Sequence, residues 1–150
     1  DGKGTERMVP IEEFIVGPGK TVLADREMIK EIVINDVRFD KLHYCKIGGR
    51  KSDAISKVSF AGGISYRKGR IEEFRCAFGA VAPTVVRSRS LEASMKGLGT
   101  EGIESVRNEV KHGYNELIRP IDDQRSTAVY RKKVCMNILD EFFDKAGDSK

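Results

Sequence analysis

Residues 54–83, AISKVSFAGGISYRKGRIEEFRCAFGAVAP, decide the fold. Both halves of the stretch carry apolar residues at spacings typical of β-strands, and a short polar run, Arg67–Arg70, separates them. We therefore predict strands over 54–66 and 71–83, joined by a hairpin turn at 67–70. The pair Gly62-Gly63 permits a bulge or a close approach of another group to the backbone.

Two further strands are predicted upstream, over Glu31–Asn35 and Lys41–Ile47, because the first alternates with β-branched residues and the second is rich in apolar ones. Between Arg7 and Thr21, proline and glycine lie so close together that we expect a constrained loop and no helix. The opening Asp1–Thr5 resembles a turn between strands. We therefore expect that the chain was cut from a longer one.

Downstream of Pro83 the apolar spacing changes from two residues to 3.6, which predicts helices. The first is expected from a cap at Ser90 through Met95, and the second from a cap at Thr100 through Leu117. The third and clearest is expected over 126–145. Strands followed by helices predict an α+β fold, in which an antiparallel sheet of three to four strands is covered by three helices.

The composition is typical of one soluble globular domain, since 33% of the 150 residues are charged and 39% are hydrophobic. We expect an arm over residues 1–24 and a domain over 25–150. No run approaches the length of a membrane span, and no secretory leader is visible, so no membrane partner is expected. The net charge is +4, but acids and bases alternate, which argues against a nucleic-acid partner. Three well-separated cysteines indicate reduced core thiols in a cytoplasmic protein.

Motifs for chemistry are mostly absent. Gly17–Thr21 ends like a phosphate-binding loop, but Phe14 replaces the glycine that such a loop requires and no convincing helix follows. His43 and His112 are far apart and have no cysteine or histidine at ligand spacing, so we expect no metal site. We also expect no catalytic residue. Helix capping or surface solvation explains the acid pair Asp122-Asp123 more simply than acid–base catalysis.

The order of several short motifs resembles the C-terminal domain of the medium, FAD-binding subunit of molybdenum hydroxylases, the xanthine dehydrogenase and carbon monoxide dehydrogenase family. Each motif is weak alone, but together they span nearly the whole chain in the family's order. They are Val9–Phe14, Gly17–Thr21, Glu27–Ile29, Glu31–Ile34, Arg50–Val58, Ala77–Thr84, Arg87, Leu91–Ala93, Pro120–Arg125 and Tyr130-Arg131.

This resemblance implies a domain that covers the flavin of a xanthine dehydrogenase-like oxidoreductase. In such a complex FAD relays electrons from iron–sulfur clusters to NAD or another acceptor. The implied partners are an iron–sulfur subunit and a molybdopterin subunit, whose cofactors are iron–sulfur clusters and molybdopterin. The alternative is a subunit-interaction domain that never contacts a cofactor. The substrate of the complex and its electron acceptor stay open.

Two cofactor-binding residues follow from the resemblance. Lys46 matches a family lysine near the flavin ring, where a cation would stabilise negative charge on the reduced flavin. Ile29 matches an apolar residue against the ring. From residue type alone, a solvated lysine on an edge strand and an ordinary core isoleucine are the alternatives. The family's glycine-rich FAD loops have no counterpart in this sequence, so we expect the isolated chain to bind FAD weakly or not at all and to be inactive.

Overall fold

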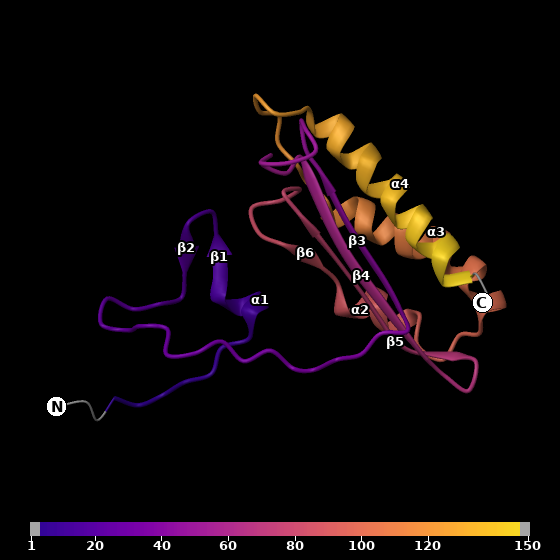
Figure 1. Cartoon of the computed structure of the whole chain (residues 1–150), viewed down its shortest axis with the longest axis horizontal. Helices are drawn as coiled ribbons and strands as arrows, with labels where there is room; N and C mark the ends of the chain where they lie inside the picture. Colours follow the sequence, from indigo (N-terminus) through magenta and orange to yellow (C-terminus); the bar gives the residue numbers. More distant parts are fainter. Residues whose placement is uncertain (1–3, 148–150) are drawn as a thin grey trace. The chain divides into compact units, whose positions relative to one another are not determined.

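The computed structural model describes residues 4–147, and the expected turn at Asp1–Thr5 therefore lies partly outside the described residues. The chain divides into two compact units, and the boundary between them in the sequence lies between Asn35 and Asp36. We describe each unit by itself. Figure 1 shows the elements along the chain.

The first unit contains one turn of helix and a small hairpin. Helix α1 spans Ile11–Phe14, so the expectation of no helix in this arm is wrong. Pro10 lies at the N-cap, where its missing N–H removes no helical hydrogen bond, and acidic residues occupy the first turn. Strands β1 (Ile15–Gly17) and β2 (Lys20–Thr21) then pair antiparallel.

The segment Gly17–Thr21 is the turn of this hairpin. Gly19 has φ +66°, in the left-handed region that favours glycine, and β2 follows directly. A phosphate-binding loop leads into a helix instead, whose N-terminal amides hold the phosphate. The geometry therefore agrees with the structural interpretation and disfavours nucleotide hydrolysis here.

The predicted strand at Glu31–Asn35 is wrong. These residues lie outside all helices and strands, and Ile32, Val33 and Ile34 are 78%, 63% and 87% exposed. The alternating pattern is real, but a strand needs a neighbour to accept its backbone hydrogen bonds, and no described residue of the chain pairs with this segment.

The second unit is built on a four-stranded antiparallel sheet in the order β3-β4-β5-β6. Strand β3 spans Lys41–Ile47, as predicted. Strands β4 (Val58–Arg67) and β5 (Arg70–Gly79) form the predicted hairpin, although both are shorter at their outer ends than expected. A two-residue strand, β6 (Val86–Arg87), was not predicted.

The turn between β4 and β5 has Lys68 at φ 52° and Gly69 at φ 73°. Two consecutive positive φ angles define the primed turn whose twist matches a two-residue hairpin. The register shift in this hairpin falls between Ser65 and Tyr66, and not at the glycine pair. At Gly62 the alternative expectation, a close approach, is confirmed, since an added Cβ would lie 2.6 Å from Phe142 Cζ.

The three predicted helices are present as α2 (Arg89–Ser94), α3 (Thr100–Leu117) and α4 (Ala128–Gly147). Two of the predicted caps are wrong. Ser88, not Ser90, caps α2 by accepting a hydrogen bond from the Leu91 N–H, and α3 begins after Gly99 without a side-chain cap. Ser88 has the extended backbone that a capping side chain needs, whereas Ser90 is already inside the helix.

The helices lie on one face of the sheet (Figure 1), as the predicted α+β fold requires. Phenylalanines join the two layers: the Phe142 ring of α4 lies 5.3 Å from Phe60 and 5.2 Å from Phe74, between centroids, and Phe143 stacks on Phe74. Because this aromatic cluster lies between the helices and one face of the sheet, the opposite face of the sheet points away from the helices. Within residues 4–147, no helix is long and apolar enough to cross a membrane.

Candidate functional site

Lys46 lies on the outer face of the sheet, away from the helices. Side chains along β3 alternate between half-buried and exposed, and the half-buried His43 contacts Phe142 of α4. Lys46 and Tyr44 point to the other face, where Tyr44 is 72% exposed. The cation therefore stands on a face that a partner can reach.

The surface beside Lys46 is flat because the neighbouring strands present small side chains. Lys46 is opposite Ser59 of β4, and Ser59 is opposite Gly79 of β5. An added Cβ at Gly79 would lie 2.5 Å from the Ser59 Oγ, so the Ser59 hydroxyl occupies the space above this glycine. Ala61 and Ala77 form the next pair on the same face. A planar group could lie close to this surface next to the cation.

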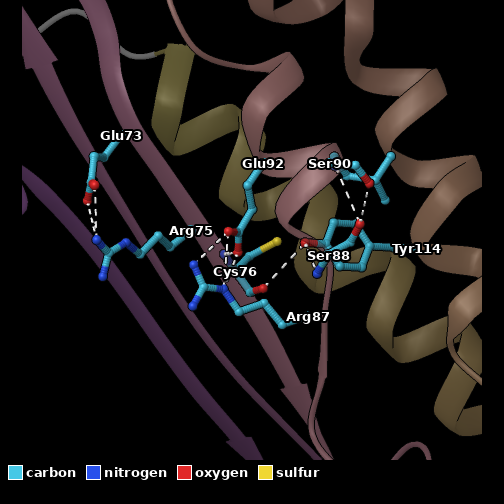
Figure 2. A network of polar contacts seen from close by, with 9 residues as sticks. Glu73, Arg75, Cys76, Arg87, Ser88, Ser90, Glu92 and Tyr114 are labelled. Carbon is cyan, nitrogen blue, oxygen red and sulfur yellow. Dashed lines mark hydrogen bonds and ion pairs between the residues drawn. The ribbon is translucent and has the colours of Figure 1, made fainter. Parts of the chain in front are cut away.

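A buried carboxylate fixes the far edge of the sheet (Figure 2). Glu92 of α2 is 6% exposed. Its oxygens accept hydrogen bonds from Arg87 Nε at 2.8 Å and Arg87 Nη2 at 2.7 Å, and from the Cys76 backbone N–H at 3.1 Å. The side chain thus takes the place that a longer β6 would occupy beside β5, and it holds the Arg87 guanidinium at the sheet edge.

The same network reaches the helices through Tyr114 of α3. Its hydroxyl donates to the Cys76 carbonyl and accepts from the Ser88 N–H, both at 3.4 Å. Burial raises the pKa of this hydroxyl, so it stays protonated as a hydrogen-bond donor. On the outer face, Arg75 pairs with Glu73 at 2.7 Å, as Figure 2 also shows.

The motif Pro120–Arg125 has a structural role. Asp122 accepts a hydrogen bond from the Ala128 N–H at the start of α4, so the capping interpretation is confirmed. Asp123 binds Arg125 and the nearly buried Arg131, whose Nη1 donates to the Ala80 carbonyl at 3.0 Å. The side-chain hydrogen bonds from Arg125 contribute most to lowering the pKa of Asp123, and the hydrogen bond from Arg131 lowers it further. The loop before α4 is thereby attached to the end of β5.

The cysteines agree with the expectation of core thiols. Cys76 and Cys135 are buried, Cys45 is half-buried, and all three are free. Burial raises the pKa of both Cys76 and Cys135 to about 12, which keeps these thiols protonated and unreactive.

Ile29, the second predicted cofactor residue, belongs to the first compact unit and is 51% exposed. Lys46 belongs to the second. The flavin contact of these two residues, which belong to different units, stays a prediction.

Sequence reasoning missed Arg87 and Glu92 as a pair. Both residues belong to the motifs that carry the resemblance. Arg87, however, lies in β6, and Glu92 lies five positions later in α2, so no regular spacing pairs them in the sequence. Only the turn from β6 into α2 brings the two charges together. A conserved spacing in related sequences would be the signal that finds such a pair.

Together, the helix-backed antiparallel sheet and its carboxylate-closed edge define an α+β domain that presents one open sheet face. Residues 43–146 match the model of the CO dehydrogenase flavoprotein C-terminal domain, and the chain belongs to this family. It is thus of the type found at the C-terminus of the FAD subunit of molybdenum hydroxylases.

Solved structures share the fold. Carbon monoxide dehydrogenase from Hydrogenophaga pseudoflava, in a form lacking the Mo-pyranopterin moiety of its cofactor, is 24% identical with a TM-score of 0.73. Quinoline 2-oxidoreductase from Pseudomonas putida 86 is 20% identical with a TM-score of 0.62. In both cases the match covers 90% of this chain and 46% of the other. The chain thus spans about half the length of these relatives. No curated protein sequence matches it.

Proposed function

We propose that this chain is the C-terminal part of the FAD subunit of a xanthine dehydrogenase-like molybdenum hydroxylase, an oxidoreductase. There it covers the flavin that relays electrons from iron–sulfur clusters to NAD or another acceptor. Its partners in the complex are an iron–sulfur subunit and a molybdopterin subunit. The observation that supports this proposal most directly is the exposed Lys46 beside the flat part of the sheet.

The residues of this chain fit one side of FAD and not the whole molecule. A flat ring system could lie on the small side chains of β4 and β5, where the Lys46 ammonium would attract negative charge on a reduced ring. Bound FAD supplies the redox chemistry, since no protein side chain carries electron pairs as a flavin does. The glycine-rich loops that hold its pyrophosphate are expected in another domain.

The exposed apolar residues of the first unit support such a second domain. Met28, Ile32 and Ile34 are each more than three-quarters exposed, and we propose that another domain covers them in the complete subunit. We propose that residues 1–24 form an arm that follows the flavin-anchoring domain, and residues 25–150 the C-terminal domain. The first compact unit extends beyond this arm, to Asn35.

Ile29 is proposed to contact the flavin ring from this first unit. A cytoplasmic location also belongs to the proposal, and the free thiols favour a reducing compartment.

Replacing Lys46 by Met in the complete FAD subunit tests the proposal. Methionine keeps the length of the side chain but removes the charge, so the reduced flavin loses a stabilising cation. We expect the flavin midpoint potential to fall by about 30 mV or more, measured by spectroelectrochemistry. Lys96→Met, at an exposed site beyond α2, is the matched control and should leave the potential unchanged.

An unchanged potential in the Lys46→Met subunit, with FAD still bound, would favour the alternative. In that case the chain would be a subunit-interaction domain without direct cofactor contact.

A further inference from the structure

The outer face of the sheet already holds one aromatic ring. Gly63 follows Gly62 in β4, and because Gly62 faces Phe142 of α4, Gly63 faces the other side. An added Cβ at Gly63 would lie 2.6 Å from Phe39 Cγ and 2.8 Å from Phe39 Cδ1, so the Phe39 ring lies directly against the backbone of this strand. Any side chain at Gly63 would displace the ring.

A cation accompanies this ring. Gly63 pairs with Arg75 of β5, and the Arg75 guanidinium carbon lies 5.6 Å from the centroid of the Phe39 ring. Glu73 binds the same guanidinium at 2.7 Å, as Figure 2 shows, and so helps to hold it in place. A cation near the face of an aromatic ring is attracted to its electrons. The domain thus shows, with its own side chains, how a planar group and a cation share this face.

The adjacent part of the same face has a similar arrangement. Ala61 lies two residues before Gly63 in β4 and pairs with Tyr44 of β3 and with Ala77 of β5. Ala61 is exposed although β4 is an interior strand of the sheet. Lys46, two residues after Tyr44, supplies the cation. An interior strand that carries only a methyl group at this point leaves space for a planar group of another molecule.

Tyr44 lies at the boundary between the two parts. Its side chain points to the outer face between Leu42 and Lys46 of the same strand, and it is 72% exposed. Leu42 pairs with Gly63 at the covered end, whereas Lys46 lies at the open end. Residues two positions apart on a strand are separated by about 7 Å, so the phenol reaches a planar group that lies beside the Lys46 ammonium.

We propose that Tyr44 contacts the edge of the flavin ring and fixes the position of the ring along the sheet. This inference rests on the proposed function and adds a second ring-contacting residue on β3. The phenol limits how far the ring can shift toward the Phe39 end, which is already covered. Offset or edge-to-face contact between two aromatic systems stabilises this position.

Time-resolved fluorescence of FAD bound to the complete FAD subunit tests this contact. A tyrosine in contact with an excited flavin transfers one electron to it, and the return of that electron restores both groups, so the emission decays fast. Phenylalanine is much harder to oxidise, whereas the indole of tryptophan is oxidised readily. Tyr44→Phe should therefore lose the fastest component of the decay, and Tyr44→Trp should keep it.

Tyr130→Phe is the matched control. Tyr130 belongs to α4, on the helix side of the sheet, and is 43% exposed, so the same substitution there should leave the decay unchanged. Because Tyr44 is 72% exposed, Tyr44→Phe removes no buried contact and should keep the melting temperature of the wild type. An unchanged decay in Tyr44→Phe, with FAD still bound, would overturn the inference. Equal loss of the fast component in Tyr130→Phe would overturn it too, since the effect would not be specific to the outer face.

Failure of this inference is distinguishable from failure of the proposed function. If Lys46→Met lowers the flavin potential but Tyr44→Phe leaves the decay unchanged, the flavin lies on this face without touching Tyr44. If neither variant has an effect, the proposed flavin contact of the domain fails together with this inference.

Discussion

At the scale of single residues, the Glu92 carboxylate is a buried charge whose stability depends on its hydrogen-bond partners. It is nearly buried and satisfies both the Arg87 guanidinium and the Cys76 backbone N–H. Removing the charge of one member of a buried pair weakens the compensation of the other, and this costs more than the pair itself contributes. Arg87 is 30% exposed, so water reduces this cost in part.

We therefore expect Glu92→Gln to lower the free energy of unfolding by about 2 kcal/mol. Glutamine still offers an oxygen to the Cys76 N–H but no charge to Arg87. Chemical denaturation followed by circular dichroism measures the change. The control is Glu72→Gln at the Arg67–Glu72 pair, where both side chains are exposed and the expected change is below about 0.5 kcal/mol. Equal effects at the two sites would contradict the role assigned to Glu92.

At the scale of elements, the contact between β3 and α4 depends on an uncharged histidine. The His43 ring stacks on Phe142 with centroids 6.3 Å apart, and its Nδ1 lies 2.8 Å from the Lys145 ammonium. Burial lowers the pKa of His43, Lys145 lowers it further, and Glu141 opposes the shift. Because Nδ1 must accept the Lys145 proton, the folded domain favours the neutral ring.

This contact makes stability depend on pH. The unfolded chain protonates His43 near its ordinary pKa of about 6.5, whereas the folded domain does so only at lower pH. The stability is therefore complete above about pH 6.5 and falls as the pH drops below it. Melting temperatures from pH 8 to pH 5.5 measure the effect, and His43→Gln should flatten the profile. A profile that is identical in the variant would show that another group titrates.

The elements also show what the sequence could and could not predict. Strands β3, β4 and β5 and all three long helices were predictable, because their apolar periodicity reflects the same burial that stabilises them. The pattern at Ile32–Ile34 is equally regular, but no described residue pairs with this segment, so periodicity alone predicted a strand that does not form. The predicted Ser90 cap was wrong for a different reason: Ser88 and Ser90 are both of a residue type that caps helices well, and only the backbone angles show that Ser88 is the cap.

The candidate site was also predictable from the sequence only in part. Lys46 could be placed on the exposed face from the alternation of β3. The flat surface beside it could not, because it arises from the register that pairs Ser59 with Gly79 and Ala61 with Ala77. Register is a property of two strands together and is not written in either one.

At the scale of the whole molecule, the chain is proposed to provide only one side of a cofactor site. We expect titration of FAD into the purified chain to show weak binding or none, because the groups that would hold the pyrophosphate are not found among its motifs. Isothermal calorimetry or flavin fluorescence measures it. Stoichiometric binding at micromolar concentration would contradict the proposed division of labour between two domains.

The carboxylate that closes the edge of β5 has a consequence for assembly in the cell. An uncovered strand edge can template growth of a fibril, because its backbone groups accept the next chain that arrives. In this domain the Cys76 N–H is taken by Glu92, and β6 covers only Ala77 and Phe78. A foreign strand added there would have to displace a buried ion pair, so this edge is protected against polymerisation.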